Sequence, residues 1–250
     1  MTLIVYGDFT SPECYVASRR VSALRVVGVD VEWRAVELDA QLPVSGRAVT
    51  EEEQRDVTGR FSQLNDELLA GETLPWVAPT LVAKTEAAVS AYAEAYGAGV
   101  GEDVRRLLFE LYWRHGADIG NPTVLRTPLV GPMLRGHSGV DSLHRFGFAV
   151  SVDRGPITTE AFRRIRFWRS EWQDLGRPDL PCVQEQDQAF TGLQAVRRLG
   201  GEVSRLQPNP ELLELPDPTR YPPLSVHPNL TWVSEVGGTW EDTYQQSPLD

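Results

Sequence analysis

Two short segments carry the residue types that could do chemistry. The first, Ser11-Pro12-Glu13-Cys14, follows an apolar run near the N-terminus, and the second is Leu180-Pro181-Cys182. A cysteine attacks a disulfide or an electrophile only as its thiolate. A serine hydroxyl cannot form a mixed disulfide, but it can donate a hydrogen bond to a sulfur anion. The two segments therefore point to sulfur chemistry, with Ser11, Cys14 and Cys182 as the candidate groups.

Ser11 stands where a helix is expected to begin. A serine followed by proline is a strong helix start, with the serine at the N-cap and the proline in the first turn. The free N–H groups and the positive end of the helix dipole would stabilise a thiolate beside Ser11. The alternative is that Ser11 is only a cap. Glu13 is expected to face solvent and to stabilise the helix dipole, or to act as a base beside the site.

The two cysteines could also have a structural role instead of a chemical one. Cys14 shares an apolar stripe with Ala17, Val21 and Leu24, which predicts a buried and inert thiol, whereas Arg19, Arg20 and Arg25 fall off that stripe. The alternative hypothesis is a redox role for Cys14 or Cys182. A Cys14–Cys182 disulfide is a further alternative, disfavoured because a reducing compartment keeps thiols free.

The elements that must position these residues follow from hydrophobic patterning. The pattern predicts strands at residues 3–6 and 29–36, before and after the helix that begins after Ser11. A strand, a helix and a strand in this order make a βαβ unit. Helices are expected within 46–154, including one that opens with a Thr50–Glu53 capping box and runs to about Ala70, and one over 102–115. Residues 180–191 read as two strands that turn at Gln186-Asp187. A last helix over 193–199 is expected to close at Gly200-Gly201.

Composition excludes several classes of protein. The net charge of −11 disfavours nucleic acid as a partner. No apolar run is long enough to span a membrane. The four histidines and two cysteines lack metal-ligand spacing, so no metal is expected. The N-terminus lacks a signal-peptide pattern, from which we expect a cytoplasmic protein.

The last segment, 205–250, differs in composition from the rest. Eight of the chain's 18 prolines lie within residues 206–250, where acidic residues outnumber basic ones by seven to one. Its leucines and aromatic residues are too many for a purely solvated tail. We expect an extended arm that packs back on the body or onto a partner subunit, which would make a homodimer.

Three segments together resemble one family. Asp8-Phe9-Thr10-Ser11-Pro12-Glu13-Cys14-Tyr15 is similar to the active-site opening of the DsbA-like thioredoxin-fold proteins, where C-P-x-C opens the first helix. Leu180-Pro181-Cys182-Val183 resembles the family's cis-proline strand, which predicts a cis bond before Pro181. The stretch 116–125 resembles the inserted helical domain of the branch that holds FrnE-like oxidoreductases and 2-hydroxychromene-2-carboxylate isomerases.

Departures from the family pattern shape the functional expectation. Ser11 stands at the nucleophilic cysteine's position, so dithiol exchange within the motif is lost. Ser11, Pro12 and Tyr15 fit the Ser-Pro-x-x-Tyr motif of kappa-class glutathione transferases and hydroxychromene isomerases, whose serine binds the thiolate of glutathione. Asp179 stands where a second glycine is common before the cis-proline, and its charge disfavours an anionic thiol.

We therefore predict an α/β thioredoxin fold at 1–45 and 155–204, an inserted helical subdomain at 46–154 and an arm at 205–250. The resemblance implies a thiol-dependent oxidoreductase, isomerase or transferase that uses glutathione or another low-molecular-weight thiol and a small-molecule substrate. Ser11 and Cys14 would be the catalytic residues. The binding residues would be Pro12, Glu13, Tyr15, Leu180, Pro181 and Cys182. The alternatives are a monothiol redox protein that uses Cys14 or Cys182, and a degenerate thioredoxin fold that serves as a binding or assembly module.

Overall fold

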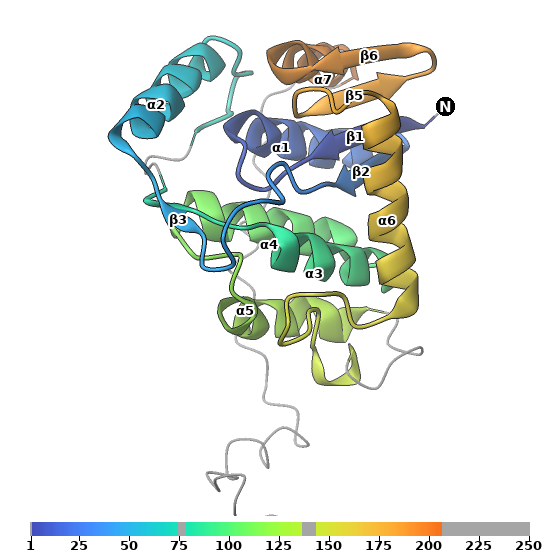
Figure 1. Ribbon diagram of the computed structural model, residues 1–250. Helices are drawn as coiled ribbons and strands as arrows, with labels where there is room; N and C mark the ends of the chain where they lie inside the picture. Colours follow the sequence, from blue (N-terminus) through green and yellow to red (C-terminus); the bar gives the residue numbers. More distant parts are fainter. Residues whose placement is uncertain (1, 75–78, 137–143, 207–250) are drawn as a thin grey trace, which may run out of the picture. The chain divides into compact units, whose positions relative to one another are not determined.

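The computed structural model describes residues 2–74, 79–136 and 144–206. It contains a four-stranded sheet in the order β2-β1-β5-β6, seen in the upper half of Figure 1. Its strands are β1 (Leu3–Gly7), β2 (Val31–Ala35), β5 (Cys182–Glu185) and β6 (Gln188–Thr191). Strand β1 is parallel to β2 and antiparallel to β5, and β5 is antiparallel to β6. The predicted βαβ start and the two predicted strands before the last helix are confirmed.

Helix α1 (Pro12–Val26) packs against β2, and helix α7 (Gly192–Leu206) packs against β5 and β6. Helix α1 packs against α7, α4 and α2, so it is buried on nearly every side. The expectation that Arg20 lies off the buried face is wrong, because its side chain is 1% exposed. A buried guanidinium needs partners, and Arg20 bonds to both carboxylate oxygens of Glu72 and to the carbonyl oxygen of Val196.

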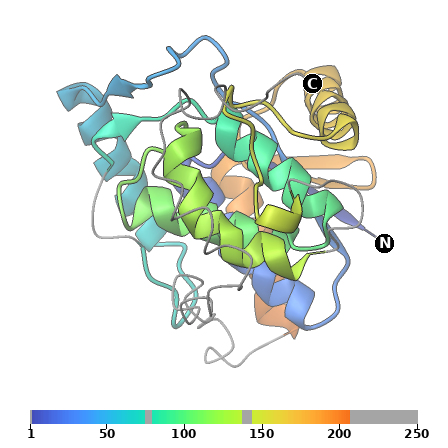
Figure 2. The ribbon, with the colours of Figure 1, turned by 90° about the horizontal axis from the view of Figure 1, so that it is seen from below.

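The chain between β2 and the last two strands is mostly helical. It contains α2 (Glu51–Asn65), α3 (Glu86–Gly97), α4 (Gly101–Trp113), α5 (Pro122–Arg135), the short helix η1 (His144–Phe146) and α6 (Thr159–Asp174). Helices α3 and α4 lie side by side, and α5 packs against them (Figure 2). The capping box at the start of α2 is present as predicted. A small sheet of β3 (Arg47–Ala48) and β4 (Leu81–Val82) was not predicted.

Aromatic side chains join this helical block to the sheet. The ring of Phe9, which follows β1, packs against Tyr92 of α3 and Phe109 of α4. The indole N–H of Trp113 donates to the carbonyl oxygen of Phe9 at 3.0 Å. The loop that leads from β1 into α1 is thereby fixed from the side of the helical block.

The chain divides into two units, Met1–Arg220 and Tyr221–Asp250. All of the described residues belong to the first unit. Most of the expected arm at 205–250 lies outside the described residues, and the first two residues of that range are the end of α7. No helix in the described ranges is long and apolar enough to cross a membrane.

Helix α7 does not close at Gly200-Gly201, contrary to the prediction, and continues to Leu206. The reason lies on α1. A Cβ at Gly200 would stand 2.6 Å from the Nη1 atom of Arg20, whereas a Cβ at Gly201 would meet nothing within 4 Å. Gly200 therefore serves close packing on the Arg20 guanidinium rather than helix termination.

This difference predicts opposite effects for two neighbouring substitutions. Gly201→Ala should raise the free energy of unfolding by about 1 kcal/mol, since alanine is the better helix former. Gly200→Ala should lower it by about 1–3 kcal/mol, because the clamped Arg20 side chain has no room to move away. Urea denaturation of both variants measures the two values. Equal stabilisation by both would show that the contact with Arg20 is not tight.

Candidate functional site

Ser11 caps α1 as predicted. Its backbone is extended (φ −89°, ψ 127°), and its Oγ accepts a hydrogen bond from the backbone N–H of Cys14 at 3.3 Å. Pro12 occupies the first helical position. The Ser11 residue is 3% exposed. Its hydroxyl oxygen is therefore held at the N-terminus of a helix, where free N–H groups favour negative charge.

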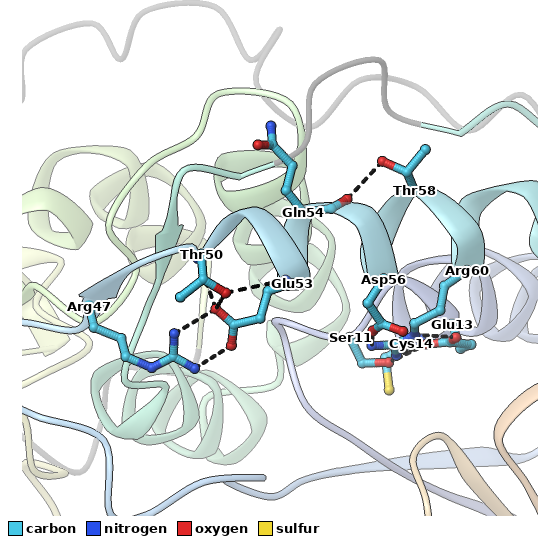
Figure 3. Close-up of polar contacts among 10 residues, drawn as sticks. All are labelled: Ser11, Glu13, Cys14, Arg47, Thr50, Glu53, Gln54, Asp56, Thr58 and Arg60. Atoms are coloured by element: carbon cyan, nitrogen blue, oxygen red, sulfur yellow. Dashed lines mark hydrogen bonds and ion pairs between the residues drawn. The ribbon is translucent and has the colours of Figure 1, made fainter.

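Glu13 differs from the prediction that it faces solvent. The residue is 9% exposed. The Ser11 hydroxyl donates to its Oε2 at 3.0 Å, and Arg60 of α2 donates through Nε to Oε1 at 2.8 Å and through Nη2 to Oε2 (Figure 3). A buried carboxylate needs such a counter-charge. Packing of α2 beside the start of α1 supplies it, and this contact was not predicted because Arg60 is 47 residues from Glu13.

Both cysteines are free and buried. Burial raises the pKa of the Cys14 thiol far above its ordinary value, despite the hydrogen bond with Ser11. Burial raises the pKa of the Cys182 thiol to about 11. Both thiols are therefore protonated at neutral pH, and neither is a ready nucleophile.

These pKa shifts predict that the native thiols alkylate slowly. Cys14 and Cys182 should react with iodoacetamide at least about tenfold more slowly at neutral pH than in the urea-unfolded chain, since only the thiolate reacts. The Cys182 rate should rise only as the pH approaches 11. Peptide mass spectrometry measures the extent of alkylation of each cysteine separately. Fast modification of either native thiol below neutral pH would contradict the burial that raises both pKa values.

The Leu180–Pro181 peptide bond is cis. Cys182 pairs with Tyr6 across the β1–β5 ladder, and this antiparallel register continued by one residue places Pro181 opposite Gly7. The carbonyl oxygen of Pro181 accepts from the N–H of Gly192, the first residue of α7, at 2.8 Å. The loop before β5 thus lies at the edge of the sheet where β1 leads into α1.

Tyr15 is 1% exposed and packs on the helical block. Its hydroxyl donates to Glu110 of α4 at 3.3 Å, and its ring packs against Phe109 and Trp113. These contacts give Tyr15 a packing role, and its expected role in binding stays a prediction. Leu180 is buried as well, at 6% exposure.

A pocket of about 250 Å³ lies beside the start of α1. Ser11 itself is not in the pocket lining, but two residues connected to it are. Thr10 precedes Ser11 in the chain, and Arg60 binds the Glu13 carboxylate that accepts the hydrogen bond of the Ser11 hydroxyl. The polar lining includes Asp8, Thr10, Asp39, Glu53, Asp56, Arg60 and Thr85, and the apolar lining includes Leu38, Leu42, Val49, Val57, Val82, Tyr112 and Trp113. The pocket thus lies between the β1–α1 loop and the helical block. No residue of α1 is in the pocket lining, and Pro181 is not in it either.

Among the described residues, no group of three or more histidine, cysteine, aspartate or glutamate side chains is placed to hold a metal ion. The groups at the site that could take part in a reaction are the Ser11 hydroxyl, the Glu13–Arg60 ion pair and the two cysteines.

The sheet order β2-β1-β5-β6, the helix that begins at Ser11 and the cis-proline before β5 together define a thioredoxin-like fold with helices inserted after β2. Residues 2–129 match the DSBA-like thioredoxin domain. The chain belongs to this family, as its sequence resemblance predicted.

Solved structures agree on the fold. A probable DsbA oxidoreductase from Streptomyces coelicolor matches with a TM-score of 0.57 and 18% identity, over 84% of this chain and 91% of that chain. A 2-hydroxychromene-2-carboxylate isomerase matches at 0.52 and 18%, over 82% and 96%. The cytosolic disulfide reductase DsbM from Pseudomonas aeruginosa, solved with glutathione, matches at 0.55 and 16%, over 83% and 98%. No curated protein matches the sequence significantly.

Proposed function

We propose that this chain is a thiol-dependent enzyme of the DsbA-like family, of the oxidoreductase, isomerase or transferase type, in which Ser11 binds the sulfur of a low-molecular-weight thiol. The observation that carries the proposal is the position of the Ser11 hydroxyl. It stands at the N-cap of α1, where the family motif has its nucleophilic cysteine, and its oxygen is fixed by the Cys14 N–H at 3.3 Å.

The Ser11 hydroxyl can donate its hydrogen bond to a bound sulfur instead of to Glu13 without leaving Glu13 unpartnered. The hydroxyl now donates to Glu13, but Glu13 also accepts two hydrogen bonds from Arg60. Rotation about the Cβ–Oγ bond would turn the proton from Glu13 to a sulfur atom, and the carboxylate would keep its counter-charge. The positive end of the α1 dipole would then add to the stabilisation of the sulfur.

The surroundings of the two cysteines argue against the monothiol alternative, because both thiols are buried and both have raised pKa values. The solved DsbM structure holds glutathione, which supports a thiol ligand for the fold. A small-molecule substrate, glutathione or another low-molecular-weight thiol as the cofactor, and a cytoplasmic location complete the proposal.

Binding of glutathione and of 2-mercaptoethanol to wild-type protein and to Ser11→Ala tests this proposal, by isothermal titration calorimetry at neutral pH. Ser11→Ala should weaken thiol binding by about tenfold, the value of a hydrogen bond to a charged or strongly polar acceptor. Ser204→Ala, at an exposed position on α7, should leave the Kd unchanged. Equal Kd values for the wild type and Ser11→Ala would refute the role of Ser11.

One observation favours a second candidate, a degenerate binding or assembly module. Ser11 is 3% exposed, and its hydroxyl proton already has an acceptor in Glu13. Wild-type protein that binds no thiol would support this candidate. Deletion of residues 207–250, all of which belong to the expected arm and lie outside the described residues, should then change self-association or partner binding.

A further inference from the structure

The pocket beside the start of α1 has an unequal charge. Of the described residues along it, Asp8, Asp39, Glu53 and Asp56 are acidic, and Arg60 is basic. Arg60 is already engaged, because it donates two hydrogen bonds to Glu13 and lies 3.9 Å from Asp56. Its charge is therefore largely used by groups of the protein itself. The lining of the pocket carries an excess of negative charge.

Asp8 is the most constrained of these carboxylates. It is 1% exposed. Its Oδ1 accepts from the N–H and the hydroxyl of Thr10, and its Oδ2 accepts from the N–H of Leu38 at 3.0 Å and the hydroxyl of Thr85 at 2.7 Å. All four donors are neutral. They satisfy the lone pairs of the carboxylate, but they do not compensate its charge, which a buried ion requires for a favourable environment.

Two further carboxylates stand at the more exposed side of the pocket. Asp56 of α2 has a side chain that is 68% exposed and lies beside Arg60 (Figure 3). Asp39, after β2, accepts from the N–H of Gln41 at 2.9 Å. Glu53 differs from these two, because Arg47 binds it through two hydrogen bonds. Asp39 and Asp56 therefore keep most of their capacity to bind a cation.

The opposite part of the lining is apolar, with Leu42, Val57, Val82 and Trp113 among its side chains. A volume of about 250 Å³ admits a small organic molecule rather than a bare ion. An apolar wall opposite a group of carboxylates fits a compound with a short hydrocarbon part and a protonated amine or guanidinium group.

We propose that this pocket binds its ligand through a cationic group that Asp8, Asp39 and Asp56 attract. The inference rests on the proposed function, since it places the ligand's sulfur at Ser11 and its cationic end in the pocket. The thiol used by this chain is then an aminothiol or another thiol without net negative charge. Of the cofactors in the proposed function, this selects another low-molecular-weight thiol over glutathione, whose two carboxylates and one ammonium group leave it anionic. A thiol whose only charged group is a carboxylate is repelled.

Three thiols of similar size and different charge test the inference: cysteamine (cationic), 2-mercaptoethanol (neutral) and mercaptoacetate (anionic). Isothermal titration calorimetry at neutral pH and low salt should give the tightest Kd for cysteamine, with about tenfold weaker binding at each step to the neutral and anionic thiols. High salt should reduce the differences, because Asp39 and Asp56 lie near solvent. An equal or reversed order would overturn the inference.

Matched variants locate the charge effect. The double variant Asp39→Asn/Asp56→Asn should bring the three Kd values closer together. Glu51→Gln/Glu52→Gln, which removes two exposed acids of α2 outside the pocket lining, should leave the order unchanged. If both double variants change the order equally, the preference comes from net charge and not from this pocket, and the inference fails.

Ethanolamine, the alcohol counterpart of cysteamine, separates the inference from the proposed function. Cysteamine and ethanolamine could bind with equal Kd values to the wild type and with the same values to Ser11→Ala. In that case the cation site stands and the role of Ser11 fails. If all three thiols bind better than their alcohols without a charge order, the role of Ser11 stands and the cation site fails.

Discussion

Replacement of Ser11 by cysteine is expected to give this chain the dithiol chemistry that its own motif lacks. The substitution produces C-P-E-C at the start of α1, with the new thiol three residues before Cys14. The helix N-terminus stabilises a thiolate at that position. Residues three apart in the first turn of a helix lie within the Cα separation that a disulfide requires. We therefore expect Ser11→Cys to form an intramolecular disulfide with Cys14.

Oxidised glutathione supplies the oxidant for this test, and mass spectrometry measures the product. The Ser11→Cys thiolate attacks the glutathione disulfide and releases one glutathione, and Cys14 then displaces the second, so the chain loses two hydrogens. The initial alkylation rate of Ser11→Cys should exceed that of Ser204→Cys by about tenfold at neutral pH. Equal alkylation rates and no internal disulfide would show that the start of α1 does not activate a sulfur atom.

Glu13 should moderate this activation. Its carboxylate accepts from the Ser11 hydroxyl at 3.0 Å, and a thiolate at the same position would lie beside a negative charge. The double variant Ser11→Cys/Glu13→Gln should therefore have a lower thiol pKa than Ser11→Cys alone. The pH dependence of alkylation measures both values.

Replacement of Arg20 by methionine is expected to have the largest effect on stability. Arg20 bonds to Glu72 through Nε at 3.0 Å and Nη2 at 2.7 Å, and both side chains are at most 3% exposed. Removal of the guanidinium leaves the Glu72 carboxylate buried without its counter-charge, which costs about 3–5 kcal/mol. Urea denaturation should show a loss of this size.

Two further variants identify the cause of that loss. Arg20→Met/Glu72→Gln should recover part of the stability, because the uncompensated charge is removed. Arg205→Met, at an exposed ion pair with Glu202, should change the unfolding midpoint little. No recovery in the double variant would mean that Arg20 acts through packing and its bonds to backbone carbonyls, and not through its charge.

Local sequence signals were sufficient for much of the site. Ser11-Pro12 predicted the start of α1, and the alternating pattern of residues 29–36 predicted β2. The turn at Gln186-Asp187 separates β5 from β6 as expected. Each of these features depends on residues close together along the chain, and for that reason each could be predicted from the sequence alone.

Features that depend on distant parts of the chain were missed. Glu13 was expected to face solvent, because nothing near it indicates that Arg60 of α2 packs over it. Arg20 was expected off the buried face, since its partner Glu72 lies 52 residues away. The helix break predicted at Gly200 was wrong for the same reason. A glycine is required at this position by close packing against Arg20 of α1, and not because the helix ends there.

A titration of 2-mercaptoethanol followed by nuclear magnetic resonance tests the role of Ser11 most directly. The backbone N–H of Cys14 donates to the Ser11 oxygen, so its amide signal reports any change at that hydroxyl. We predict that the Cys14 amide is among the most strongly shifted signals in the wild type, and that Ser11→Ala abolishes this shift. A thiol that binds while the Cys14 amide stays unmoved, or that shifts it equally in Ser11→Ala, would contradict the assignment of the sulfur to Ser11.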